Sequence, residues 1–197
     1  MRKITFYFDF LSPYAYLARY KLMEIAAKHN CEIVYRPIDL KRAKVESGND
    51  GPSTLMIANK LAFANKDFER WAKIYGVPFR SIGGPVGGRD LNVGALYAIK
   101  KNCAEEYLDR VYLHCWGMGG KADDAEFLSG LMSKMGWDEA DFNAFVASDE
   151  AEAEYERTFQ LAAADHVFGV PAFVVDDELW WGNDRLFMVD EYLSAHH

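Results

Sequence analysis

Apolar and polar residues follow different periods in different parts of this chain, and the changes of period outline its elements. Residues 3–10 are almost continuously apolar and aromatic, which predicts a buried strand. From Pro13 to about His29 the apolar residues recur at helical spacing. Residues 31–36 alternate like a second strand. This order predicts a βαβ unit with two parallel strands.

The middle of the chain has a different character. Residues 47–52, Ser-Gly-Asn-Asp-Gly-Pro, form a break. Helical spacing then predicts helices over about 54–75, 91–116, 122–135, 138–147 and 150–165, with a glycine-rich loop at 83–88. Because no strong strand pattern occurs in this region, we interpret it as a helical insertion.

Strand character returns after Val167. Residues 172–175 and 178–181 are separated by Asp176-Asp177 and can pair as a hairpin, and a last helix follows Gly182. The order β-α-β, helices, β-β-α predicts an α/β fold of thioredoxin-like type. Its sheet domain would comprise residues 1–46 and 151–197, interrupted by an all-helical domain of residues 47–150.

Composition restricts the kinds of molecule that this chain is expected to bind and the compartment in which it is expected to work. The chain has 22 basic and 30 acidic residues, a net charge of −8, and no basic stripe, which argues against nucleic acid as the main partner. No segment has the length of a membrane span. Asp9 and Pro13 interrupt the first apolar stretch, and no cleavage site follows it, so we exclude a signal peptide. Three cysteines without metal-binding or redox spacing indicate buried small side chains and a reducing, cytoplasmic compartment.

The turn after the first strand holds the most informative residues. Redox proteins built on such a strand-turn-helix carry Cys-x-x-Cys there, but this chain has Ser12 and Ala15 at the two cysteine positions. Ser12 followed by Pro13 is also a good helix N-cap. A hydroxyl at a helix N-terminus can hold a thiolate by hydrogen bonding but cannot form a disulfide. The reactive sulfur would therefore come from a ligand.

Other candidates have an ordinary and a functional interpretation. Pro171 either begins a strand or follows a cis peptide bond facing the Ser12 turn, which would leave the Val170 backbone to pair with an extended peptide. Asn183-Asp184 either cap the last helix or bind an amino-acid-like head group. The remaining candidates are interpreted first as structural or surface residues: Lys44, Asn49, Lys60, Arg89, His166 and one of the pair Trp180-Trp181.

Several of these runs together resemble a known family. The segments are residues 6–14 (Phe-Tyr-Phe-Asp-Phe-Leu-Ser-Pro-Tyr), Gly48-Asn49, residues 168–171 (Phe-Gly-Val-Pro) and residues 180–188, which begin Trp-Trp-Gly-Asn-Asp-Arg. They resemble 2-hydroxychromene-2-carboxylate isomerases, which group with the kappa-class glutathione transferases, along nearly the whole chain.

The resemblance implies a thioredoxin-like domain with a helical insertion, glutathione as cofactor, and a homodimer. It implies that Ser12 lies beside the glutathione sulfur and is catalytic. It also implies that glutathione is bound by Ser12, Asn49, Lys60, Val170, Pro171, Asn183 and Asp184. Lys44 or Arg89 could hold the carboxylate of a small aromatic substrate.

The activity implied is a cis-trans isomerisation of 2-hydroxychromene-2-carboxylate in naphthalene-type catabolism, by reversible addition of the glutathione thiolate. Three alternatives stay open. They are a kappa-type transferase or peroxidase acting on small electrophiles, a disulfide oxidoreductase, and a glutathione-binding protein without turnover. We expect no metal, nucleic-acid or membrane partner.

Overall fold

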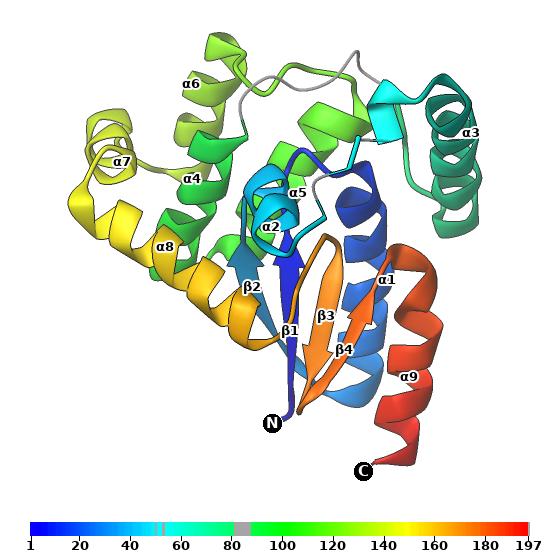
Figure 1. The fold of residues 1–197 in the computed structure, drawn as a ribbon. Helices are drawn as coiled ribbons and strands as arrows, with labels where there is room; N and C mark the ends of the chain where they lie inside the picture. The colour runs from blue at the N-terminus through cyan, green and yellow to red at the C-terminus, as the bar shows by residue number, and fades with distance from the viewer. Residues whose placement is uncertain (50, 53, 81–87, 197) are drawn as a thin grey trace.

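A four-stranded mixed sheet lies at the centre of the computed structural model, which describes residues 1–49, 51–52, 54–80 and 88–196 (Figure 1). Its strands are β1 (Lys3–Phe8), β2 (Glu32–Pro37), β3 (Ala172–Val175) and β4 (Glu178–Trp181), in the order β2-β1-β3-β4. β1 pairs with β2 in parallel and with β3 antiparallel, and β3 and β4 form an antiparallel hairpin. The predicted βαβ and ββα units are therefore confirmed, and so is the thioredoxin-like α/β fold.

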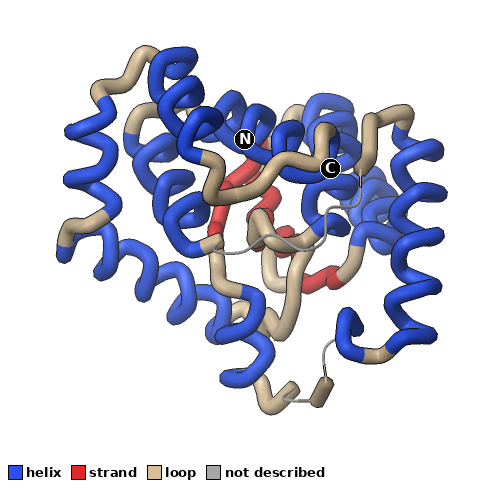
Figure 2. Tube along the Cα trace, turned by 90° about the horizontal axis from the view of Figure 1, so that it is seen from above, coloured by secondary structure: helices blue, strands red, loops and turns tan. Residues whose placement is uncertain are grey.

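The two faces of the sheet are covered by different helices (Figures 1 and 2). On one face Phe6, Phe8 and Phe173 lie in a single apolar cluster with α1 (Pro13–His29) and α9 (Leu186–Ala195). The rings of Phe6 and Phe173 stack with centroids 5.5 Å apart. On the other face Tyr7 and Ala172 pack with α4 (Arg89–Lys100) and α8 (Asp149–Ala164). Alternation of side chains along each strand produces this division.

The helices between β2 and β3 form the rest of the molecule. In chain order they are α2 (Leu40–Glu46), a 3₁₀ turn η1 (Thr54–Met56), α3 (Ala58–Tyr75), α4, α5 (Ala104–Tyr112), a π-helical turn η2 (Leu113–Gly117), α6 (Ala125–Met135), α7 (Glu139–Val146) and α8. A short 3₁₀ turn η3 (Asn183–Arg185) precedes α9. No helix in the described part of the chain is long and apolar enough to cross a membrane. The domain boundaries at residues 46/47 and 150/151 stay predictions.

Three element predictions needed correction. The first strand ends at Phe8 rather than residue 10, because the Asp9 carboxylate accepts the N–H of Leu11 and turns the chain. The helix predicted over 91–116 is divided into α4, α5 and η2, and Asn102 adopts a left-handed φ of 57° at the first break. The short helix α2 was not predicted at all. Residues 83–87 of the predicted loop lie outside the described residues.

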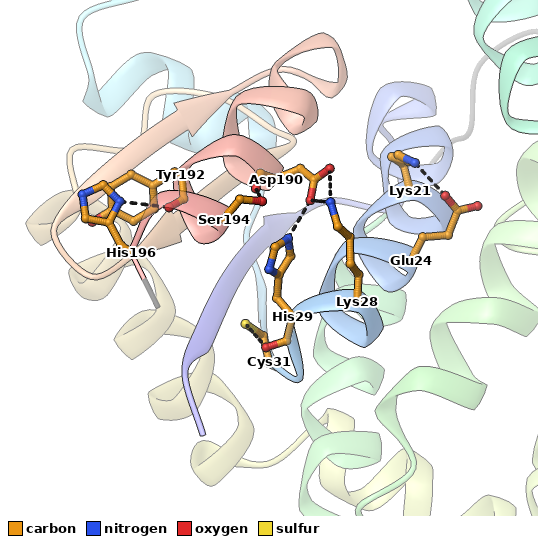
Figure 3. A network of polar contacts seen from close by, with 9 residues as sticks. All are labelled: Lys21, Glu24, Lys28, His29, Cys31, Asp190, Tyr192, Ser194 and His196. Carbon is orange, nitrogen blue, oxygen red and sulfur yellow. Dashed lines mark hydrogen bonds and ion pairs between the residues drawn. The ribbon is translucent and has the colours of Figure 1, made fainter.

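A polar cluster joins α1 to α9 at the end of the sheet domain away from the Ser12 turn (Figure 3). Asp190 on α9 accepts hydrogen bonds from Lys28 at 2.7 Å and contacts His29 Nε2 at 2.6 Å, both in the last turn of α1. Cations are favourable in this last turn because they face the negative end of the helix dipole. Lys28 chiefly, together with His29, holds the pKa of Asp190 below its usual value.

Candidate functional site

Ser12 caps the N-terminus of α1, as the sequence predicts. Its side chain is 3% exposed, and its Oγ accepts the N–H of Ala15 at 3.2 Å. Pro13 occupies the first helical position. The 17-residue helix directs a positive partial charge toward this serine. Because the hydroxyl also has an O–H to donate, Ser12 can stabilise an anion at the helix terminus.

The loop before β3 lies at the same end of the sheet. The Val170-Pro171 peptide bond is cis. Ala172, the first residue of β3, pairs with Tyr7 near the end of β1. Pro171 therefore lies alongside the point where β1 ends and the Ser12 turn begins, which brings these two sequence-predicted segments together.

Asn183 and Asp184 follow the hairpin that begins at Pro171. Neither side chain caps η3 or α9, so the ordinary interpretation as helix caps is wrong. Asn183 is 3% exposed, and among the described residues neither its Oδ1 nor its Nδ2 has a hydrogen-bond partner. Asp184 is half exposed and accepts a hydrogen bond from Arg185 at 2.7 Å. A buried amide without a partner is uncommon and calls for an explanation, such as strain, an ordered water or ion, or a functional role.

Helix α3 lies beside these residues. The hydroxyl of Tyr75 donates to the backbone carbonyl of Asn183 at 3.3 Å, and that of Tyr14 on α1 donates to Asp67 at 2.9 Å. Burial, with a contribution from the charge of Asp184, raises the pKa of Tyr75 to about 12. Both phenols therefore stay protonated at neutral pH and act as hydrogen-bond donors that join α1, α3 and the Asn183 turn.

The four remaining predicted site residues lie on the insertion side. Lys44 is half-buried on α2, and the exposed Asn49 donates its backbone N–H to the carbonyl of Lys44 at 2.8 Å. Lys60 is exposed on the first turn of α3. Arg89 begins α4, and its guanidinium contacts Asp90 at 3.3 Å and also Glu152 on α8. The structure thus joins Lys44 to Asn49 but engages Arg89 in ion pairs.

The tryptophan pair points to opposite faces, as predicted for neighbours on a strand. Trp180 is half-buried and packs against Tyr192 of α9, with ring centroids 5.0 Å apart. Trp181 is 51% exposed and contacts Phe168, with centroids 4.9 Å apart. His166 is an exposed residue with a φ of 57° in the turn after α8. An exposed aromatic pair therefore lies next to the Val170-Pro171 loop.

The three cysteines are free thiols. Burial raises the pKa of the Cys115 thiol to about 12, so this sulfur is unreactive at neutral pH. Within the described ranges, no group of three or more histidine, cysteine or acidic side chains could hold a metal ion.

A buried polar pair that the sequence did not predict, Asp9 and Asn92, lies next to the Ser12 turn. Asp9 is fully buried, and its carboxylate accepts the N–H groups of Leu11 at 2.9 Å and Leu40 at 2.8 Å. Asn92 on α4 is 1% exposed and donates to Asp9 Oδ1 at 3.1 Å. Burial raises the pKa of Asp9 to about 6, against the effect of these donors. The signal available in the sequence was an aspartate at the end of an otherwise apolar strand.

Two open grooves lie elsewhere on the surface. One, of about 370 Å³, runs along the outer edge of β2, and one of about 310 Å³ is lined by Arg2, His29, Cys31, Leu193 and His196. None of the predicted site residues lines either groove.

Known proteins match the whole chain. Residues 3–194 match the model of the DSBA-like thioredoxin domain. The chain is 40% identical over 192 residues to a 2-hydroxychromene-2-carboxylate isomerase of Pseudomonas putida. This match covers 97% of the present chain and 94% of the relative. It is 39% identical to the protein of the same name from Sphingobium xenophagum, with 98% of both chains covered.

A solved structure gives the same result. The fold superposes on a 2-hydroxychromene-2-carboxylate isomerase with a TM-score of 0.90 and 37% identity, covering 98% of this chain and 95% of the other. With the described fold, these similarities show that the chain belongs to the DSBA-like thioredoxin domain family and, within it, to the family of the 2-hydroxychromene-2-carboxylate isomerases.

Proposed function

We propose that this chain is a glutathione-dependent isomerase that interconverts 2-hydroxychromene-2-carboxylate and trans-o-hydroxybenzylidenepyruvate in aromatic catabolism. The observation that carries the proposal is the 40% identity, over 97% of the chain, to a curated isomerase named for this substrate. The site supports it independently, because Ser12 replaces a redox cysteine at a helix N-terminus and so suits a sulfur anion that a ligand brings.

The residues around Asn183 fit glutathione. The γ-glutamyl end of glutathione carries a carboxylate and an ammonium group. The buried amide of Asn183, which has no hydrogen-bond partner among the described residues, can donate to the carboxylate, and the Asp184 carboxylate can pair with the ammonium group. Val170 and Pro171 precede β3, where an extended tripeptide backbone can pair as an added strand. Lys60 and Asn49 would contribute polar contacts from the insertion side.

When bound, glutathione would supply a thiol whose addition to the conjugated carbon turns the double bond into a single bond that can rotate, and elimination of the thiol would restore the double bond and free glutathione. The protein would favour the ionised form of this sulfur. The Ser12 hydroxyl would donate a hydrogen bond to it, and the N-terminus of α1 would stabilise its negative charge. The N-cap bond to Ala15 fixes the Ser12 oxygen at the first turn of the helix.

Of the two candidates for the substrate carboxylate, Lys44 is the better one. Arg89 is already paired with Glu152 and Asp90, so a carboxylate could bind there only by displacing them. Lys44 lies on the short helix that leads to Asn49, on the side from which the insertion would approach glutathione. A homodimer stays a prediction.

An ultraviolet time course on 2-hydroxychromene-2-carboxylate tests the proposal. The reaction is followed with enzyme and catalytic glutathione, with either component left out, and with a thiol assay at the end. We expect conversion that needs both components and leaves the glutathione unconsumed. Consumption of glutathione would indicate a transferase, and conversion without glutathione would refute the cofactor assignment.

A disulfide oxidoreductase is the function that the family description alone would favour. Ser12 and Ala15 occupy the two positions of its cysteine pair, so the chain lacks the dithiol that disulfide exchange requires. An insulin-reduction assay should therefore show no activity above the thiol control.

A further inference from the structure

The backbone of the turn that carries Ser12 is hydrogen-bonded by two buried side chains. One is Asp9, at the start of the turn, and the other is Asn92, on α4. We infer that Asp9 and Asn92 act as a positioning pair that fixes Ser12 for the reaction. This inference rests on the proposed function, in which Ser12 acts on the cofactor sulfur. Neither residue would contact the reacting atoms, since both are buried and directed at backbone groups.

Three consecutive backbone N–H groups of the turn have acceptors on Asp9 or Asn92. Phe10 N donates to Asn92 Oδ1 at 3.2 Å, Leu11 N donates to Asp9 Oδ1 at 2.9 Å, and Ser12 N donates to the Asp9 carbonyl at 2.9 Å. The side chains of the pair therefore bind the N–H groups of Phe10 and Leu11, and the backbone carbonyl of Asp9 binds that of Ser12. The position of Ser12 Oγ depends on this backbone, because the only hydrogen bond of the Ser12 side chain within the described residues is the one it accepts from the N–H of Ala15.

Asn92 connects the turn to the rest of the protein. Besides its bonds to Phe10 and Asp9, its Nδ2 lies 3.2 Å from the carbonyl of Ile38 and 3.2 Å from the hydroxyl of Tyr155 on α8. The Asp9 carboxylate in turn accepts the N–H of Leu40 at the start of α2. The pair thus ties the Ser12 turn to α2, α4 and α8, the helices of the insertion and of the far sheet face.

Two further donors hold the same turn from the insertion. Tyr112 on α5 donates to the Asp9 carbonyl at 3.1 Å, and Trp116 Nε1 in the π-helical turn η2 donates to the Phe10 carbonyl at 2.8 Å. π-helical turns occur frequently at functional sites, where they redirect a side chain. Here the redirected side chain reaches the backbone two residues before Ser12.

The positioning role of the pair can be tested by changing the pH, because Asp9 is titratable and faces other titratable groups. The titratable groups that face it are Asp39 at the start of α2, Tyr112 on α5 and Tyr155 on α8. Among the described residues no lysine or arginine bonds to it, so N–H dipoles alone hold its charge. An Asn92→Asp substitution keeps the shape of the side chain at position 92 but would place a second carboxylate against that of Asp9. The pair would then need a shared proton, as two adjacent carboxylates do.

The experiment compares wild type, Asn92→Ala, Asn92→Asp and Asp9→Asn with a control, Tyr107→Phe. Tyr107 is a fully buried hydroxyl donor to the carbonyl of Leu91, and its ring packs against Phe10 with centroids 5.9 Å apart. Tyr107→Phe removes this buried hydroxyl but keeps the ring beside the Ser12 turn. Two readouts are needed. The first is hydrogen exchange of the amides in residues 9–16, which requires no substrate. The second is the separation of kcat from KM for glutathione and for 2-hydroxychromene-2-carboxylate.

We expect exchange of the residue 10–12 amides to rise at least about tenfold in Asn92→Ala and Asp9→Asn but not in Tyr107→Phe. kcat should fall about 10- to 100-fold, the range expected for a displacement near 1 Å, with KM for glutathione changed far less. In Asn92→Asp, kcat relative to wild type should rise as the pH is lowered toward 5. A pH-independent loss in Asn92→Asp, or a loss no larger than in Tyr107→Phe, would overturn the inference.

Failure of the proposed function gives a different pattern. Wild type would then leave 2-hydroxychromene-2-carboxylate unconverted, while the exchange data would still show whether the pair holds the Ser12 turn. Unchanged exchange in Asn92→Ala and Asp9→Asn would overturn the positioning role whatever the activity.

Discussion

The backbone N–H of Gly182 donates to the carbonyl oxygen of Pro171 at 2.9 Å. This bond joins the two ends of the β3–β4 hairpin and so links the loop with Val170 to the turn with Asn183. Gly182 has a φ of 104°, and a Cβ there would lie 2.7 Å from Asp184 Oδ1. The hairpin therefore presents the two predicted glutathione-binding segments in a fixed relation to each other.

Replacing Ser12 by alanine should lower turnover more than it lowers affinity. The hydrogen bond to a thiolate is lost, and bonds to charged groups contribute about 1.5–3 kcal/mol, so kcat should fall roughly 10- to 100-fold. The N-cap bond to Ala15 is lost as well, at about 1 kcal/mol of stability. Ser148→Ala is the matched control, because Ser148 caps α8 by the same bond to Ala151. Equal kcat values for Ser12→Ala and Ser148→Ala would remove Ser12 from the mechanism.

Asn183→Leu should separate stability from binding. The amide is buried without a partner among the described residues, so an apolar side chain of similar shape should leave the unfolding free energy unchanged or raise it. Glutathione affinity, measured by calorimetry, should fall at least about tenfold, the effect of losing one bond to a charged group. Asn143→Leu, at an exposed amide on α7, serves as the control. Wild-type affinity in Asn183→Leu would rule out its role in binding.

Asp9 should make stability fall with rising pH in a defined range. Its pKa is raised from 3.8 to about 6, chiefly by burial, so the folded chain holds this proton more tightly than the unfolded chain does. The contribution of Asp9 is therefore complete below about pH 4 and is lost as the pH passes about 6. The change amounts to about 3 kcal/mol.

Urea unfolding of wild type and Asp9→Asn between pH 4 and 8 isolates this contribution. The unfolding free energy of wild type minus that of Asp9→Asn should decline by about 3 kcal/mol as the pH rises. Any pH-independent cost of the substitution does not affect this change. A difference that stays level across the range would contradict the raised pKa.

Gly88→Ala should disturb the Ser12 turn. A Cβ on Gly88 would lie 2.7 Å from Leu11 Cγ and 3.1 Å from Asp9 Oδ1, so the turn would have to shift. Overpacking of this kind costs about 1–3 kcal/mol. Gly130→Ala on α6, where no atom lies within 4 Å, should instead stabilise by up to about 1 kcal/mol. Thermal unfolding of both variants measures the contrast, and equal shifts would show that the turn accommodates the methyl group.

The parts of this protein that local sequence predicted are those governed by periodicity and by capping. The strands, the Ser12 cap and the Asp176-Asp177 hairpin turn all follow from residues that are close in sequence. The Asp9–Asn92 pair joins residues 83 positions apart, and nothing in either local pattern connects them. Helix α2 was missed because seven residues are too few to show a period. Its start depends instead on the side chain of Asp39, which accepts the N–H of Lys41 at 2.8 Å.

The pairing of β1 with β3 has a consequence for synthesis of the chain. Phe6 lies beside Phe173 in the sheet, so β1 cannot receive its second partner until β3, which follows α8, has left the ribosome. Until then an apolar strand presents an open edge, which is a template for wrong pairing. The helices from α2 to α8 can form locally during that interval and pack around the nascent βαβ unit. Translation speed through the insertion, or a chaperone that covers β1, should therefore affect the yield of folded protein more than it affects the stability of the finished molecule.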